Sequence, residues 1–143
     1  MQIKQISVFI ENKAGRLYDV SKVLTENKIN LRALSLAETS DFGILRLIVD
    51  KPDDALKILK ANEFTVGITN VVAVEVPDQA GGLCSVLAIM DEADINVEYM
   101  YAFVEKKSNH AILIFRFDNL EDVVDTLHAK GLKMLSEKEV LSS

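Results

Sequence analysis

Two glycine-containing turns carry the residue types and spacing in this chain that are best suited to chemistry. The segment Ile-Glu-Asn-Lys-Ala-Gly-Arg-Leu at residues 10–17 returns at residues 76–83 as Val-Pro-Asp-Gln-Ala-Gly-Gly-Leu, so Gly15 recurs as Gly81, 66 positions later (81 − 15). Apolar residues at helical spacing follow each glycine, which predicts a helix that begins at the turn. The free N–H groups of a first helical turn attract a carboxylate, and a glycine lets a ligand approach the backbone closely. The turns therefore predict binding of a small molecule rather than catalysis.

The residues that usually perform catalysis or bind metals do not form a recognisable set. Cys84 is the single cysteine and stands beside Leu83 and Val86 in a helical stripe, so we expect a small buried thiol with no base to activate it. His110 and His128 have no cysteine, histidine or carboxylate at the spacings of a zinc or iron site. A phosphate-binding Gly-x-x-x-x-Gly-Lys segment is also absent from the sequence. We expect no enzyme, no metal and no cofactor.

Two pairs of neighbouring acids have a structural explanation. Asp53-Asp54 and Glu121-Asp122 each precede an apolar helical stripe. Negative charge in the first turn of a helix is favoured by the helix dipole. We interpret both pairs as helix-start charges, not as general acids or bases.

The repeat continues beyond the turns and sets the domain organisation. Ile29-Asn30 matches Ile95-Asn96 in the same register, whereas residues 43–50 match residues 111–118 with an offset of 68 (118 − 50). The two additional positions indicate an insertion in a loop. A fixed period of this length means that each copy is one supersecondary unit. We expect two domains, at residues 1–70 and 71–143.

Each copy follows the same order of strands and helices. In the first copy, strands are predicted at residues 3–10, 31–38 and 44–49 and from residue 64. The first helix runs from the glycine to about residue 27. A second helix follows Asp50, which is an expected N-cap, and Pro52 is tolerated in its first turn. In the second copy the elements are residues 72–76, 83–93, 95–104, 111–117, 120–130 and 132–135. Right-handed crossovers then give two tandem ferredoxin-like βαββαβ domains of the α+β class, with antiparallel sheets and helices on one face.

Some apolar surface is left over by this arrangement. Tyr99, Tyr101 and Phe103 alternate with apolar residues, so both faces of that strand need cover. Residues 65–76 have no linker composition, so the last strand of copy one runs almost directly into the first strand of copy two. We expect the copies to be tightly held and the protein to be a homodimer.

Charge and hydropathy exclude some partners. A formal net charge of −6, with scattered lysines, argues against nucleic acid. The sequence has no apolar run near the about 18 to 20 residues that a membrane helix needs. We expect a cytoplasmic protein, because no charged-then-apolar leader precedes the first strand.

The repeated pattern resembles the ACT domain: strand, [Asn/Asp]-x-x-Gly-x-Leu, helix, Ile-Asn and strand, inside a βαββαβ unit. The resemblance covers the whole chain and is closest to stand-alone tandem ACT proteins. It implies a regulatory module for a small molecule, mostly an amino acid, held at the seam between paired domains. On this resemblance and the repeat, the candidate ligand-binding residues are Asn12, Ala14, Gly15, Arg16, Leu17, Asn30, Asp78, Ala80, Gly81, Gly82, Leu83 and Asn96.

Each candidate also has a structural interpretation. Gly15 and Gly81 can be turn residues that permit a positive φ, with no role in binding. Asn30 and Asn96 can simply close the loop after each first helix. Asp78 can be a helix N-cap, or its carboxylate can pair with the ammonium of an amino acid.

Two functions therefore stay open. The first is a regulatory amino-acid sensor whose ligand state is read by a partner enzyme or transporter. The second is a ligand-independent regulatory or assembly subunit that docks onto an enzyme of amino-acid metabolism.

Overall fold

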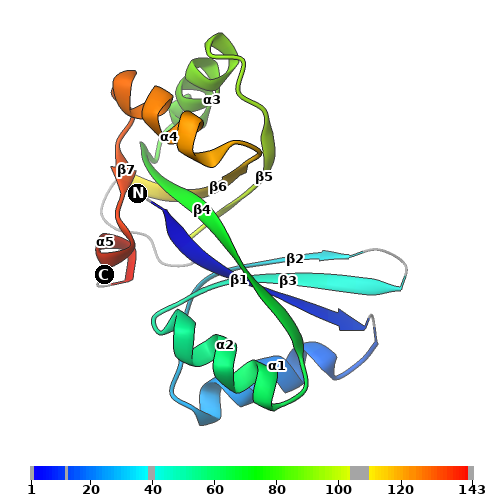
Figure 1. Cartoon of the computed structure of the whole chain (residues 1–143). Coiled ribbons are helices and arrows are strands. Elements are labelled where there is room, and N and C mark those ends of the chain that lie inside the picture. The colour runs from blue at the N-terminus through cyan, green and yellow to red at the C-terminus, as the bar shows by residue number, and fades with distance from the viewer. Residues whose placement is uncertain (1, 12, 39–40, 104–109, 142–143) are drawn as a thin grey trace. The chain divides into compact units, whose positions relative to one another are not determined.

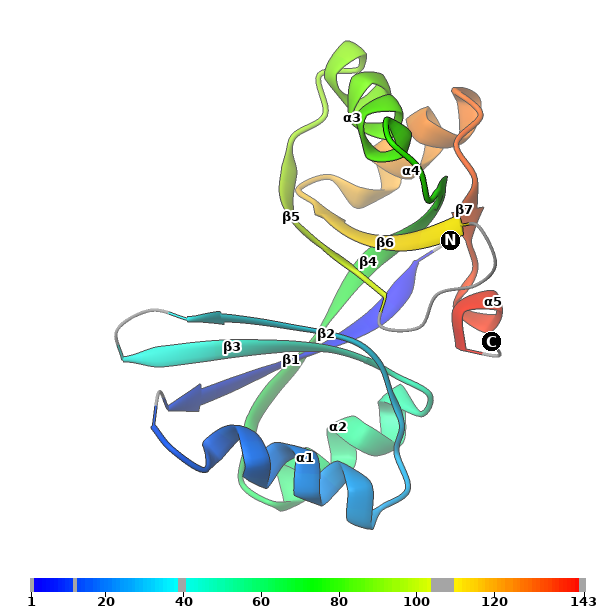
Figure 2. The same cartoon turned by 180° about the vertical axis from the view of Figure 1, so that it is seen from behind.

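The protein is described here by a computed structural model, which places residues 2–11, 13–38, 41–103 and 110–141 (Figures 1 and 2). The chain divides into two compact units. The first unit is Lys4–Thr69, and the second is Asn70–Ser143 together with Met1–Ile3.

The first unit has the order βαββαβ. Its elements are β1 (Ile3–Glu11), α1 (Arg16–Glu26), β2 (Leu31–Glu38), β3 (Phe42–Val49), α2 (Pro52–Ala61) and the beginning of β4 (Thr65–Pro77). The strand order across the sheet is β2-β3-β1-β4. β3 pairs antiparallel with both of its neighbours, so that Leu47 stands opposite Ile6 on one side and opposite Leu34 on the other.

The second unit repeats this order. The rest of β4 is followed by α3 (Gly82–Glu92), β5 (Val97–Ala102), β6 (His110–Phe117), α4 (Leu120–Ala129), β7 (Met134–Leu135) and a short α5 (Glu137–Leu141). The strand order is β5-β6-β4-β7, with antiparallel pairing throughout. In each unit the two helices of the repeat cover one face of its sheet (Figure 2). The predicted α+β fold of two ferredoxin-like units is confirmed.

Alternating apolar residues on the strands build each core. In the first unit Ile6, Val8 and Ile10 point from β1 toward the helices and pack with Val20 and Leu24 of α1. In the second unit the inward residues of β4 pack against α3 and α4 (Val72, Val74, Val76, Val86, Met90, Val123, Leu127). The rings of Phe115 and Phe117 stack with centroids 5.7 Å apart. Burial of these side chains stabilises each unit by the hydrophobic effect.

β4 is one continuous strand of 13 residues that belongs to both units. Its run of valine, isoleucine and threonine is typical of a strand, and its proline comes only at the end, at Pro77. The sequence predicted that the last strand of copy one leads almost directly into copy two, and the two strands are in fact one element.

Two predicted side-chain roles are wrong. The thiol of Cys84 is exposed, because α3 buries Gly82, Val86 and Met90, a stripe of four-residue steps that leaves residue 84 outside. Asp50 is not the N-cap of α2, which is Lys51. The Asp50 carboxylate instead accepts the backbone N–H of Asn30 at 3.0 Å.

Some element boundaries also differ from the sequence prediction. β5 ends at Ala102, β7 has only Met134 and Leu135, and Val104 lies outside the described residues. The helix α5 was not predicted. It begins with a capping box, in which the Ser136 hydroxyl accepts the N–H of Glu139 and the Glu139 carboxylate accepts the N–H of Ser136, both at 3.1 Å. The Ser-x-x-Glu spacing at residues 136–139 was the sequence signal for it.

Within residues 2–11, 13–38, 41–103 and 110–141, no helix combines the length and apolar character that a membrane crossing requires.

Candidate functional site

The helix-start turns, residues 13–15 and 78–81, place a glycine in the left-handed conformation at each helix N-cap. Gly15 has φ 89° and Gly81 has φ 87°. Helix hydrogen bonds begin directly after them, since the N–H of Asp19 donates to the Gly15 carbonyl and the N–H of Ser85 to the Gly81 carbonyl, both at 2.9 Å. A glycine has no side chain, so no N-cap side chain bonds the first-turn N–H groups of α1 or α3.

The space beside each turn glycine is open. A Cβ atom built on Gly15 or Gly81 would meet no atom of the described residues within 4 Å. The positive φ confirms the structural role of both glycines, because L-residues rarely adopt it. The open space beside them is also what a ligand needs to reach the helix N-terminus.

In the first unit, a cavity of about 310 Å³ lies on the β2 side of the turn. Lys13, Ala14, Gly15 and Leu17 line it from the turn and α1, and its other walls come from the strands (Ile10, Glu11, Leu36, Glu38, Gly43). Leu17 was predicted to belong to the helical stripe, but it is 44% exposed at the mouth of this cavity.

A second and larger cavity of about 490 Å³ lies beside the start of α1 in the same unit. It is lined by Arg16, by three phenylalanines and by residues near the end of β1 and the start of β4 (Phe9, Phe42, Phe64, Ile10, Glu11, Glu63, Thr65). The Arg16 guanidinium lies over the Phe64 ring, with its carbon 5.2 Å from the centroid. It also pairs with Asp19 at 3.4 Å.

In the second unit, a cavity of about 360 Å³ lies beside α3. It is lined by the turn, by α3, by the end of β4 and by the loop before β7 (Gln79, Ala80, Gly81, Gly82, Ser85, Val86, Ile89, Glu75, Pro77, Gly131, Leu132, Lys133). Lys133 bonds Glu75 across this cavity at 2.7 Å, and that hydrogen bond and charge raise the pKa of Lys133. The direction in which Gly82 would carry a Cβ is filled by the carbonyl oxygen of Pro77.

Two other candidates, Leu83 and Asp78, lie near the second turn without lining these cavities. Leu83 is in the first turn of α3 and is 41% exposed. Asp78 is exposed in the second turn, but it is not the N-cap of α3, which is Gly81. Asn12 lies outside the described residues.

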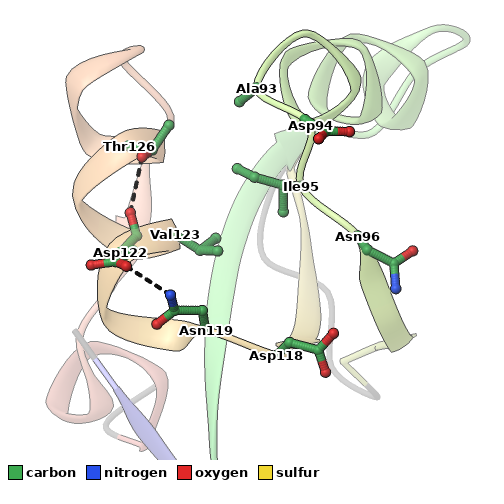
Figure 3. Close-up of a pocket in the computed structure, with 9 residues that line it drawn as sticks. All are labelled: Ala93, Asp94, Ile95, Asn96, Asp118, Asn119, Asp122, Val123 and Thr126. Atoms are coloured by element: carbon green, nitrogen blue, oxygen red, sulfur yellow. Dashed lines mark hydrogen bonds between the residues drawn. The ribbon is translucent and has the colours of Figure 1, made fainter.

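The two asparagines after the first helices do not join the turns. Asn30 closes its loop, because its backbone N–H and carbonyl both bond Asp50, at 3.0 and 3.2 Å. Asn96 lines a separate cavity of about 330 Å³ between the end of α3 and the start of α4 (Figure 3). Neither side chain lines the cavities described beside Gly15 or Gly81.

The cavity at Asn96 is acidic, with Asp94, Asp118 and Asp122 in its walls (Figure 3). Asp122 accepts a hydrogen bond from Asn119 at 2.7 Å, which ties the start of α4 to its first turn. A hydrogen bond to Asp118 raises the pKa of the nearby Glu98 carboxyl. Among the described residues, no group of three or more His, Cys, Asp or Glu is arranged to hold a metal ion.

The sequence did not identify the three phenylalanines beside Arg16 as cavity residues. Phe9 lies two residues before the end of β1, Phe42 begins β3 and Phe64 precedes β4, so they are far apart along the chain. Phe9 and Phe42 are 48% and 61% exposed, which is unusual for large apolar side chains. The only signal in the sequence was that each stands at or near the end of an expected strand.

Comparison with known proteins identifies the family. A family model for an ACT domain pair matches residues 1–143. The crystal structure of a protein from Bacteroides thetaiotaomicron is similar over 100% of this chain and 98% of that one, with 40% identity and a TM-score of 0.93. The ligand-free regulatory subunit of aspartate kinase from Thermus thermophilus has the same fold, with 14% identity and a TM-score of 0.61 over 88% of this chain and 90% of that one.

A third likeness is to Escherichia coli aspartokinase III in complex with lysine and aspartate, with 17% identity and a TM-score of 0.53 over 90% of this chain and 31% of that one. The comparison with curated proteins gave no match. The match over the whole chain, with two βαββαβ units in tandem, means that this protein belongs to the ACT domain family and consists of an ACT domain pair.

Proposed function

We propose that this protein is a regulatory protein that binds an amino acid, with the ligand carboxylate held at the helix-start turns. One observation carries the proposal. Both copies place a left-handed glycine before a helix whose N-cap has no side chain, with a cavity directly beside it. The ligand-binding residues that we propose are the predicted residues of the two turns and helix starts, centred on Gly15 and Gly81, without Asn30 and Asn96, which lie outside these cavities.

Helix N-termini supply part of the binding energy. The dipole interaction with a carboxylate contributes about 0.3 to 1 kcal/mol when exposed and up to about 2 when partly buried. This is enough to orient a ligand but not enough for tight binding. Side chains that line the cavities must supply the remainder, and their volumes of about 310 and 360 Å³ suit a molecule of the size of an amino acid.

Two further points support a regulatory role. Aspartokinase III has a structure with lysine and aspartate, and the Thermus protein is a regulatory subunit. These proteins share the fold with this chain at low identity, so they support the class of function and not the identity of the ligand. We propose that this chain has no catalytic activity of its own and that a partner enzyme or transporter reads its ligand state.

A ligand-independent assembly subunit is the second candidate function. Exposed apolar side chains in the first unit favour it, because such residues often mark surfaces for protein contact (Phe9, Leu17, Tyr18, Leu34, Leu36, Phe42). In either case we propose that the protein acts as a homodimer in the cytoplasm.

Thermal melting of the full chain against each common L-amino acid distinguishes the two functions. A ligand at 100 times its dissociation constant adds about 2.7 kcal/mol to the stability of the native state. For a chain of this size the melting temperature should then rise by several degrees. If no amino acid raises it, the sensor proposal fails and the assembly subunit remains.

A further inference from the structure

The two copies carry cavities at equivalent places beside their first helices. Residues 9, 11 and 16 of the Arg16 cavity correspond to residues 75, 77 and 82 of the Gly82 cavity, with the offset of 66 (82 − 16). Residues 63, 64 and 65 correspond to residues 131, 132 and 133, with the offset of 68 (133 − 65). The two cavities can therefore be compared residue by residue.

Their chemistry has diverged. In the second unit, Glu75 and Lys133 form an ion pair across the cavity, and Gly82 supplies no side chain. In the first unit the corresponding positions hold Phe9 and Thr65 in place of that pair, and Arg16 replaces the glycine. The first cavity is thus lined by phenylalanines and one arginine, whereas the second has an ion pair in its wall.

We propose that the Arg16 cavity binds an amino acid with a large apolar or aromatic side chain, which makes the first copy the site that sets ligand specificity. This inference rests on the proposed amino-acid-binding function and adds to it the class of ligand and the copy that selects it. Arg16 binds the carboxylate, and the phenylalanine rings enclose the side chain.

Arg16 is prepared for a carboxylate. Its guanidinium is held over the Phe64 ring, and its Nε is buried with no hydrogen-bond partner among the described residues. The pair with Asp19, at 3.4 Å, engages another nitrogen of the group. The side chain keeps 32% of its surface exposed, so a carboxylate in the cavity can approach its terminal nitrogens and form charge-assisted hydrogen bonds there.

The phenylalanines supply an apolar wall of suitable shape. Phe64 is buried and forms the floor, whereas Phe9 and Phe42 keep 48% and 61% of their surface exposed. Removal of these rings from water is favourable, and aromatic rings pack against one another in stacked or edge-to-face geometry. The volume of about 490 Å³ lies within the about 300 to 1,000 Å³ of small-molecule sites.

Acidic residues at the rim complement the ammonium of the ligand. Glu11 and Glu63 both line the cavity, and Glu11 already pairs with Lys13 at 3.1 Å. Glu63, in the loop before β4, is therefore the carboxylate that we assign to the ammonium group. A positive and a negative group on the wall of an apolar cavity fit a zwitterion better than a simple anion.

Calorimetric titration of the full chain with L-phenylalanine, L-serine and 3-phenylpropionate tests the inference. We expect L-phenylalanine to bind at least tenfold more tightly than L-serine, and 3-phenylpropionate, which lacks the ammonium, to bind more weakly than L-phenylalanine. Phe42→Ala and Arg16→Gln should each weaken L-phenylalanine binding at least tenfold. Tyr18→Ala, an exposed aromatic on α1 that does not line the cavity, is the matched control and should change it less than twofold.

The outcomes separate the inference from the function on which it rests. If L-serine or another polar amino acid binds and L-phenylalanine does not, the inference is wrong and the amino-acid-binding function stands. If none of the common amino acids binds, both are wrong. If Phe42→Ala leaves L-phenylalanine binding intact but lowers the oligomeric mass in light scattering, the phenylalanines form a subunit contact and the inference is overturned.

Discussion

The Cα atom of Gly82 faces the carbonyl oxygen of Pro77 so closely that a Cβ atom on residue 82 would overlap it. The oxygen belongs to the backbone and cannot rotate away as a side chain would. Gly82→Ala should therefore destabilise the protein by about 1 to 3 kcal/mol, the usual cost of overpacking. Urea unfolding of the full chain measures this, and a free energy of unfolding within about 0.5 kcal/mol of the wild type, the usual range for surface substitutions, would mean that the turn relaxes freely.

Substitution of the turn glycines should affect binding more than folding. In Gly15→Asp and Gly81→Asp the new side chain enters the open space beside the turn, and its charge repels a ligand carboxylate. The left-handed backbone costs roughly 1 to 2 kcal/mol for an L-residue, and a charge at the helix start offsets about 0.3 to 1 kcal/mol of that. We expect each variant to fold and to lose binding at its own turn.

Gly15→Ala and Gly81→Ala are the matched controls, because they introduce the same backbone strain without the charge. Calorimetry on all four variants separates the two effects. Unchanged binding in both aspartate variants, with folding intact, would remove the turns from the site.

The capping box of α5 should show in the titration of Glu139. Hydrogen bonds from the backbone N–H and the hydroxyl of Ser136 lower the pKa of this carboxyl. Because the pKa of Glu139 is lower in the folded chain, its carboxylate stabilises the folded state. This contribution is fully present above the unfolded pKa of about 4.3 and is lost as the pH falls through the folded pKa. Ser136→Ala should move the Glu139 midpoint, followed by NMR, back toward the ordinary value. An identical midpoint in the variant would contradict the capping role.

Separation of the copies should fail. β4 contributes strands to both units, so a cut between Asn70 and Val71 leaves each half with a truncated strand and exposed core residues. Chains of this size bury a smaller fraction of their surface on folding than larger domains do, so their stability is marginal. We expect neither half to give a dispersed amide NMR spectrum alone, and two dispersed spectra would show that each unit folds independently.

The proposed homodimer is tested by light scattering on the full chain at micromolar concentration. The exposed apolar side chains of the first unit need cover, so the mass should be at least twice 15.9 kDa. A single species at the mass of one chain would contradict it. Phe42→Ala should leave that mass unchanged, because the inferred role of Phe42 is to bind a ligand.

The sequence predicted the fold well because the repeat and the apolar alternation are local patterns. Ile6, Val8 and Ile10 alternate as a strand must, and Gly15 and Gly81 mark where α1 and α3 begin. The start of α5 was also marked, by Ser136 and Glu139, but the motif was not recognised.

The surroundings of the turns could not be predicted in the same way. Phe9, Phe42 and Phe64 meet Arg16 only because three chain segments converge at one end of the first unit. Asn30 and Asn96 stand at matching positions, yet one closes a loop through Asp50 and the other lines an acidic cavity. Sequence spacing does not determine which of these environments a side chain enters, because tertiary packing determines it.

The most direct measurement is a backbone amide NMR titration of the full chain with each common L-amino acid. If the ligand carboxylate binds at the helix-start turns, at least one amino acid will shift the amides of the first helical turn saturably, at residues 15–18, at residues 81–84 or at both. If no amino acid moves these amides, or if the saturable shifts lie only elsewhere in the chain, the turns do not bind the ligand and the account is wrong.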